Sequence, residues 1–285
     1  MADDNLFSGL EKLGLGKFSD MNLYEEENEK EKNTADAVKK SQEEKKTKEE
    51  DVLYDKSHSC PVCDNEFKVK VVKTGKVRMA GSDIDLRPKY EDVDPLKYDA
   101  IVCPKCGYAA LARFFSHISE QQIKLIRANI TPSFKGIDDK SSTYSYDNAI
   151  TRHELALANS VVKKGRASEK AYTCLKIAWL KRGKAESLGV DVKDRDKVIA
   201  AIKAEEKAYL AKAYEGFMVA MSKESFPICG MDEWTFVYLV AELAYEREDY
   251  ASAMKLLSDL VSSRVATPKL KEKARDLRML MQNKV

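Results

Sequence analysis

Histidine is scarce in this chain: only three occur among 285 residues, namely His58, His117 and His153. None lies beside a serine, cysteine or carboxylate in a known nucleophile motif, and no glycine-rich phosphate-binding loop is present. The sequence therefore predicts that the protein is not an enzyme. An enzyme of unrecognised type stays open as an alternative, and it would need a pocket that joins His117 or His153 to carboxylates.

An excess of charge of one sign is also missing. Lysine and arginine number 49 against 47 aspartates and glutamates, so the formal net charge of +2 excludes a grossly basic nucleic-acid binder at the level of the whole chain. No window is apolar for long enough to cross a bilayer, and residues 1–20 lack the basic start and apolar stretch of a secretory signal. We therefore expect no membrane partner. Six cysteines in an unsecreted chain then indicate a reducing compartment, and the predicted location is cytoplasmic.

Composition changes twice along the chain. Residues 24–51 are almost entirely charged or polar and contain too few apolar groups to offset the entropy of ordering them, so residues 1–52 are predicted to form a disordered charged tail. Residues 53–135 begin with strand-like alternation, whereas residues 136–285 are typical of successive amphipathic helices. The predicted fold class is α+β: a small β-rich module followed by an all-α helical array.

Four of the six cysteines form two Cys-x-x-Cys pairs, Cys60 with Cys63 and Cys103 with Cys106. Each pair lets two thiolates from one tight turn reach the same ion, and two facing turns supply the closed set of four sulfurs that structural zinc prefers. Gly107 would allow the backbone to fold under the metal. The sequence therefore predicts a zinc-ribbon-like module with structural Zn²⁺. Because four thiolates leave no open coordination position, the metal is expected to organise the fold and not to activate water.

Other interpretations of the cysteines stay open. A Cys-x-x-Cys pair can be a redox-active dithiol, although no βαβ pattern accompanies these pairs. His58 could replace one ligand, although the cysteines alone complete the shell. Cys174 lies on the apolar face of a predicted helix, as a small core residue does, and Cys229 has no evident partner.

The segment between the two cysteine pairs is predicted to hold a β-hairpin that turns at Thr74-Gly75, because Phe67, Val69 and Val71 alternate with polar residues and the alternation resumes afterwards. Its basic residues suggest an alternative function as a nucleic-acid-binding surface; they are Lys68, Lys70, Lys73, Lys76 and Arg78. A solvated lysine face is the competing interpretation. The acidic residues that follow, among them Asp83 and Asp85, are predicted to form a polar loop, since no calcium-loop spacing is met.

The helical half has the rhythm of tetratricopeptide repeats. Small Ala241 and Ala253 would let paired helices approach, while larger side chains fill around them. Turn residues separate the apolar patterns; they are Gly165, Gly183, Gly189, Pro227 and Gly230. We predict a tetratricopeptide-like array whose concave groove binds a protein or peptide, which would make the chain a non-catalytic interaction or adaptor protein. An irregular helical bundle is the alternative.

Five short segments carry a family resemblance: Asp85–Tyr90, Asp94–Tyr98 and Cys103–Tyr108, with Ala178–Arg182 and Tyr238–Leu243 in the helical half. Together they resemble the bacterial family called domain of unknown function 2225. The resemblance covers residues from about 53 to 285. It implies a bacterial cytoplasmic protein with a zinc-ribbon-like start, tetratricopeptide-like helices and metal ligands at Cys60, Cys63, Cys103 and Cys106. It implies no activity.

Overall fold

The computed structural model describes residues 48–137, 139 and 141–282, and the predicted tail up to residue 47 lies outside this part. Within it, three antiparallel strand pairs precede seven α-helices, which confirms the predicted α+β class. Glu49–Val52 form a 3-10 turn, η3, whose Val52 is buried. Residues from Lys48 onward form one compact unit, and the division at residues 135 and 136 stays a prediction.

Each strand pair is a separate two-stranded antiparallel sheet. The first pairs Leu53 with Val72 at one end and Ser59 with Glu66 at the other, so the segment from Cys60 to Asn65 is its turn. The predicted hairpin with its turn at Thr74-Gly75 is therefore wrong. The strands are β1 (Leu53–Ser59) with β2 (Glu66–Val72), β3 (Met79–Ser82) with β4 (Pro88–Tyr90), and β5 (Ala100–Val102) with β6 (Ala109–Leu111).

The wrong pairing has a physical cause. In β1 only Leu53 is buried and most of the other side chains are exposed, so the strand shows none of the alternation that reveals a half-buried strand. Ile84 and Leu86 lie in the turn between β3 and β4, where Leu86 has a positive φ of 66°. The strands around the cysteines are thus short hairpins that rest on the helices behind them.

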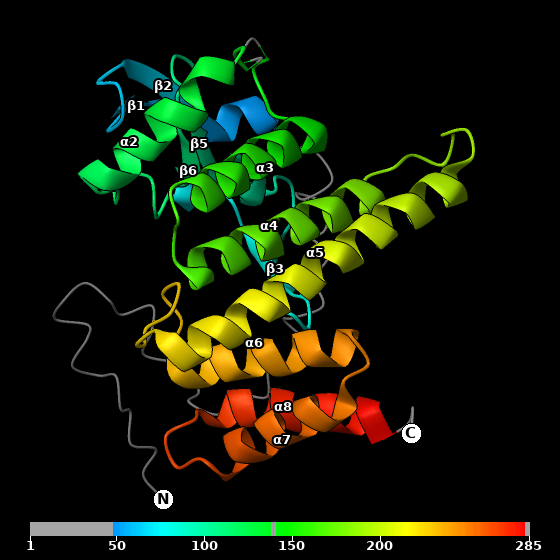
Figure 1. The fold of residues 1–285 in the computed structure, drawn as a ribbon. Coiled ribbons are helices and arrows are strands. Elements are labelled where there is room, and N and C mark those ends of the chain that lie inside the picture. The colour runs from blue at the N-terminus through cyan, green and yellow to red at the C-terminus, as the bar shows by residue number, and fades with distance from the viewer. Residues whose placement is uncertain (1–47, 138, 140, 283–285) are drawn as a thin grey trace, which may run out of the picture. The chain divides into compact units, whose positions relative to one another are not determined.

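The helices follow as stacked layers (Figure 1), with α2 and α3 beside the strands, α4 and α5 as a long pair, and α6 to α8 beyond. A capping box starts α2: Ser119 Oγ accepts from the Gln122 N–H and Gln122 Oε1 accepts from the Ser119 N–H. None of the described helices is long and apolar enough to cross a membrane. Their bounds are α2 (Glu120–Asn129), α3 (Tyr146–Val162), α4 (Ala167–Glu186), α5 (Arg195–Lys223), α6 (Glu233–Glu246), α7 (Tyr250–Ser262) and α8 (Pro268–Gln282).

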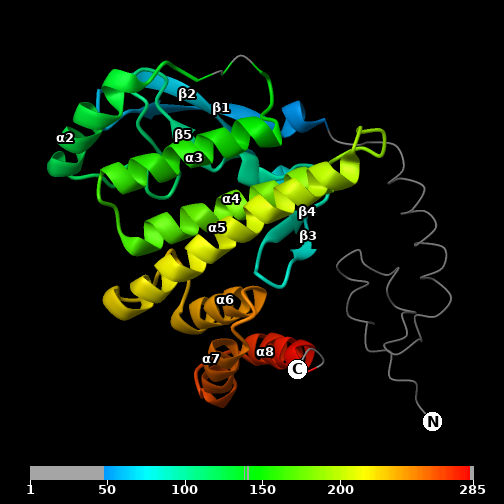
Figure 2. The ribbon, with the colours of Figure 1, turned by 45° about the vertical axis from the view of Figure 1, so that its right-hand side comes forward.

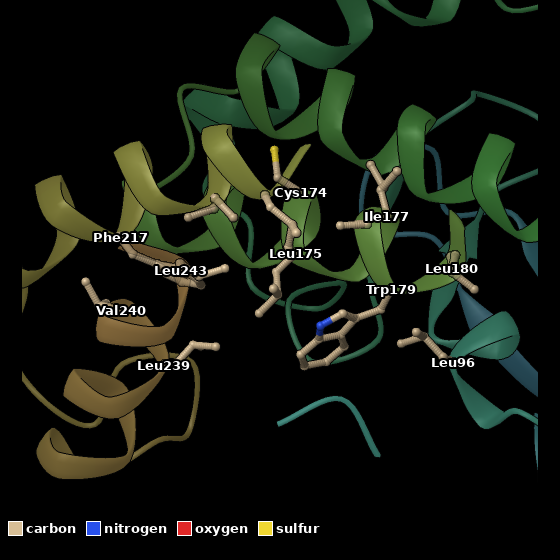
Figure 3. Close-up of a cluster of buried hydrophobic side chains, with 14 of the residues drawn as sticks. Leu96, Cys174, Leu175, Ile177, Trp179, Leu180, Phe217, Leu239, Val240 and Leu243 are labelled. Atoms are coloured by element: carbon tan, nitrogen blue, oxygen red, sulfur yellow. The ribbon is translucent and has the colours of Figure 1, made fainter. Parts of the chain in front are cut away.

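The largest core forms around α4 (Figure 3), where Cys174 is buried as predicted. Leu175 and Trp179 of α4 pack in one cluster with Phe217 of α5 and Leu239 of α6. Leu96 joins the same cluster from the 3-10 turn Pro95–Tyr98, η5. The strand-bearing half and the helical half therefore share buried apolar surface.

Gly183 corrects another prediction, because it lies inside α4 and not between helices. A side chain at this position would put its Cβ 2.6 Å from the Tyr146 ring of α3. The glycine thus allows α3 and α4 to approach closely, and it does not end the helix.

Candidate metal centre

The two Cys-x-x-Cys segments are turns of the same design. Cys60–Asn65 joins β1 to β2, and Cys103–Tyr108 joins β5 to β6. In each turn the first cysteine N–H donates to the carbonyl five residues later, at 3.0 and 2.8 Å. The N–H four residues later donates back to the first cysteine, at 2.9 and 3.1 Å. The residue after the second cysteine, Asp64 or Gly107, has a positive φ of 57° or 76°. Gly107 is the residue that the sequence predicted would let the backbone fold under the metal.

These two turns face each other and bring all four thiols together. The sulfur of Cys60 lies 3.5 Å from that of Cys106, and the sulfur of Cys63 lies 3.7 Å from that of Cys103. All four sulfurs lie within 4.8 Å of one another. Zn–S bonds of about 2.3 Å in a tetrahedron place sulfurs about 3.8 Å apart, so the described spacing fits one tetrahedral ion of this size.

Helices behind the turns hold their backbones in place. Arg127 of α2 donates from Nε and Nη2 to the carbonyl of Val62, with 2.7 Å for the Nε bond. The hydroxyl of Thr131 donates to the carbonyl of Cys106 at 3.1 Å. The amide of Asn159 on α3 donates to the carbonyl of Gly107, also at 3.1 Å. Both turns are therefore positioned by side chains from elsewhere in the chain, none of which the sequence pattern singled out.

Burial and mutual contact perturb the ionisation of the thiols. The neighbouring Cys106 thiol, the main cause, lowers the pKa of Cys60 to about 5. Contact with Cys60 and burial raise the pKa of Cys106, and burial raises the pKa of Cys103 to about 11. A thiolate at Cys60 thus suppresses the ionisation of Cys106 and Cys103, through its contact with Cys106 and through the repulsion of like charges at short range. A bound cation would remove this repulsion and permit four thiolates together.

The chain matches, over residues 53–281, the family described as an uncharacterised protein conserved in bacteria, domain of unknown function 2225. It belongs to this family. The predicted resemblance is confirmed. No curated protein and no solved structure matches the chain. Membership of domain of unknown function 2225 therefore gives the chain relatives without giving it an activity.

The predicted basic set is not gathered on one hairpin in this member of domain of unknown function 2225. Lys68 and Lys70 lie on β2, where Lys70 pairs with Asp55 of β1 at 3.9 Å. Lys73 donates to the carbonyl of Asp51 at 3.0 Å. Lys76 and Arg78 are exposed beyond the end of β2, in the connection to β3. The hairpin that would have aligned all five residues does not form.

The histidines occupy three different environments. His58 is not part of the sulfur cluster. His153 is fully buried, its Nδ1 lies 2.8 Å from the Ala149 carbonyl, and burial lowers its pKa to about 4, which keeps it neutral. His117 lines a cavity of about 700 Å³ together with Glu169 and Glu224. Among the described residues it bonds to neither carboxylate.

The carboxylates beside His117 have other partners. Glu224 accepts from the N–H and hydroxyl of Ser168, at 3.0 and 2.6 Å, and Glu169 pairs with Lys163 at 2.7 Å. These contacts are typical of residues that fix the ends of α4 and α5. The prediction that the protein is not an enzyme stays a prediction.

Proposed function

We propose that this chain is a non-catalytic interaction protein in which a structural zinc ion, held by Cys60, Cys63, Cys103 and Cys106, organises the strand-bearing half. The observation that carries the proposal is the set of four thiols at the tips of two matching turns. Cysteine sulfur is the donor that structural zinc prefers, and four sulfurs leave no position for water or substrate. The ion would hold two hairpins together and supply no reactive group.

In this proposal the helical half is a tetratricopeptide-like array that binds a protein or peptide partner. Ala241 of α6 and Ala253 of α7 are both fully buried, which suits the close helix approach of such repeats. The ring centroids of Tyr245 and Tyr250 lie 5.9 Å apart where these helices are joined. Stacked helix pairs present extended surfaces to partners, and the zinc-bearing half would add a second contact surface.

The metal part is tested by measuring metal content in the full chain purified under reducing conditions without added metal. We expect about one zinc per chain and no reactive thiols at the four positions until a chelator is added. Protein that carries no metal, and whose four thiols cycle between reduced and disulfide forms, would contradict the proposal and favour a dithiol function.

The interaction part is tested by cross-linking the tagged full chain in native lysate, with and without nuclease, and mapping the linked lysines. Cross-links that survive nuclease and fall on Lys203 and Lys207 of α5, reproduced with the purified partner, support the helical surface. Cross-links that vanish with nuclease and fall on Lys68 and Lys76 would make the chain a nucleic-acid-associated protein instead. A chain that captures nothing in either condition would contradict the proposed partner.

A further inference from the structure

A cavity of about 770 Å³ lies between the β3–β4 turn and the helical array, apart from the cysteine cluster. Figure 2 shows the hairpin of β3 and β4 beside α4 and α5, on the side where α6 lies. The wall takes Asp83 and Asp85 from the turn, Arg182 from α4, and further side chains from α5, α6 and the start of α7. A volume of this size is typical of pockets that bind small molecules or peptide side chains.

Three cations line the wall, Arg182 of α4 with Lys203 and Lys207 of α5, and the charge of Arg182 is already shared among carboxylates. Arg182 contacts Asp83 at 3.2 Å, Asp85 at 2.8 Å and Glu206 at 2.6 Å. Asp85 is only 1% exposed and also accepts from the indole N–H of Trp179 at 2.8 Å. One guanidinium therefore holds three carboxylates, and it has no charge left for another.

The carboxylate of Glu242, on α6, takes part in none of these contacts with Arg182. It lines the cavity, is 3% exposed, and its Oε2 has no hydrogen-bond partner. Among the described residues neither Glu242 nor its neighbour Glu246 forms an ion pair. Burial, and after it the charges of Asp85 and Glu246, raise the pKa of Glu242 well above the usual value. A buried carboxyl without a partner costs free energy that a cation inside the cavity would recover.

The same cavity offers surfaces for the apolar part of a cationic ligand. Tyr245 and Tyr250 line it with ring centroids 5.9 Å apart, and Ile199 and Leu210 of α5 add aliphatic surface. Aromatic faces attract guanidinium and ammonium groups, and aliphatic walls suit the methylene chain that carries them. The carboxylates would repel an anion.

A metal ion fits this cavity poorly. Within the described residues, the four cysteines are the one group of three or more ligand side chains close enough to share an ion. Asp83, Asp85 and Glu206 are spread around Arg182 and do not converge on an empty point. The arrangement favours an organic cation that can reach one carboxylate with its head and the tyrosines with its stem.

We propose that this cavity binds an alkyl-guanidinium or alkylammonium group, with the Glu242 carboxylate as its ionic partner. Two sources share this chemistry. The group can be the arginine or lysine side chain of a partner peptide, a case that rests on the proposed function, or it can belong to a free small amine. In either case Glu242 supplies charge and the two tyrosines supply the surface for the stem.

The test is a titration of the full chain, followed by calorimetry or ligand-observed NMR, with four probes. Two are blocked amino acids, Nα-acetyl-arginine amide and Nα-acetyl-lysine amide; one is agmatine; and Nα-acetyl-citrulline amide is the neutral analogue of the arginine probe. We expect the cations to bind and citrulline not to. Glu242→Gln should weaken cation binding about tenfold or more, because it removes a charge-assisted hydrogen bond. Glu233→Gln, an exposed glutamate on the same helix, should leave binding unchanged.

Each result decides a point. Citrulline binding as tightly as arginine, a Glu242→Gln variant that binds like the wild type, or no cation binding at all would overturn the proposal. Agmatine binding without the blocked amino acids would assign the site to a free amine. If Glu242→Gln fails to fold, the comparison of arginine with citrulline on the wild-type chain decides alone. A protein partner held equally by the wild type and a folded Glu242→Gln variant would contradict the side-chain source and leave the proposed function standing.

Discussion

The cysteine cluster and the acidic cavity bring polar groups together in opposite ways. The cluster takes two ligands from each of two turns, and each turn is shaped by its own backbone hydrogen bonds. The cavity takes side chains from the β3–β4 turn, α4, α5, α6 and the start of α7, and these meet only because α4, α5 and α6 pack around a shared core. Local chain geometry therefore sets the first cluster, and tertiary packing sets the second.

The two clusters also differ in how their charge is balanced. In the cysteine cluster the pKa values of Cys103 and Cys106 are raised, so four thiolates together would need a cation from outside the chain. In the cavity, Arg182 already pairs with Asp83, Asp85 and Glu206, and the buried Glu242 is left for a cation from outside the chain. Variants of the cysteine cluster should therefore change how the protein responds to added metal, whereas variants of the cavity should change how it responds to an added organic cation.

The largest effect is expected from Cys103→Ser. Losing one thiolate opens the closed shell, so the variant should lose its metal and unfold the strand-bearing half, at a cost on the order of 5 kcal/mol or more. The helical half should persist, and denaturant unfolding with metal analysis measures both changes. Cys229→Ser removes a thiol outside the cluster and should keep the metal. A Cys103→Ser variant that melts like the parent and retains its metal would show that our assignment of the site is wrong.

Arg182→Met should come next, with a loss of about 3–5 kcal/mol, because it leaves the buried carboxylates of Asp85 and Glu206 without their cation, whereas Asp83 keeps Lys89 at 2.8 Å. The variant should nevertheless keep its metal, since the cysteine turns do not use Arg182. Lys197→Met is the matched control on α5, where the side chain is 84% exposed and its loss should change stability by less than about 0.5 kcal/mol. Equal free energies of unfolding in urea for the two variants would show that Arg182 does not stabilise the carboxylates of the cavity.

Arg127→Leu should have a smaller effect that reaches the metal indirectly. It removes two donations to the Val62 carbonyl in the first cysteine turn, at an expected cost of about 1–2 kcal/mol. We expect metal transfer to a chelator to become faster, while metal content at rest stays the same. Lys124→Leu, on an exposed position of the same helix, should not change the transfer rate. Identical rates in both variants would mean that α2 does not support the turn.

The smallest expected effect is that of Glu242→Gln, which should raise the stability of the chain, whereas the preceding variants should lower it. The pKa of Glu242 is higher in the folded chain than its unfolded value of about 4.5, so the folded state holds the proton more tightly, and stability falls as the pH rises above that value. Asp83, Asp85, Arg182 and Glu246 are the charged groups that act on it. Glu242→Gln should therefore stabilise the chain by on the order of 1 kcal/mol at pH 8 and by little near pH 4.

Urea unfolding at the two pH values measures this difference, with Glu233→Gln as the control. A gain that is equal at both pH values would show that the carboxyl is not held neutral in the fold. A loss of stability at pH 8 would show that Glu242 has a partner in the free protein.

The contrast between the clusters explains what the sequence could predict. The cysteine pairs could be identified because both ligands of a turn lie three residues apart, a spacing that needs no knowledge of tertiary structure. Ala171, Leu175 and Trp179 recur at helical spacing and are core residues, and Ser119 followed three residues later by Gln122 has the spacing of a capping box. These features depend on residues that are close in the sequence.

The features that escaped prediction depend on distant partners. Asp85 was expected in a polar loop, yet it is buried because Trp179 and Arg182, more than ninety positions away, meet it. β1 was missed because its side chains are mostly exposed and only its pairing with β2 makes it a strand. Gly183 was expected to end a helix, yet the Tyr146 ring needs the space inside α4.

The order of the cysteine turns along the chain bears on how the protein is made. Cys106 precedes Tyr146, the first residue of α3, so all four thiols leave the ribosome before any of the longer helices exists. Domains generally begin to fold from the N-terminus during synthesis. The two cysteine turns can thus pair before α3 and the helices after it are made. When Asn159 emerges later, the carbonyl of Gly107 that it binds is already in place, so the finished turns act as a template on which α3 docks.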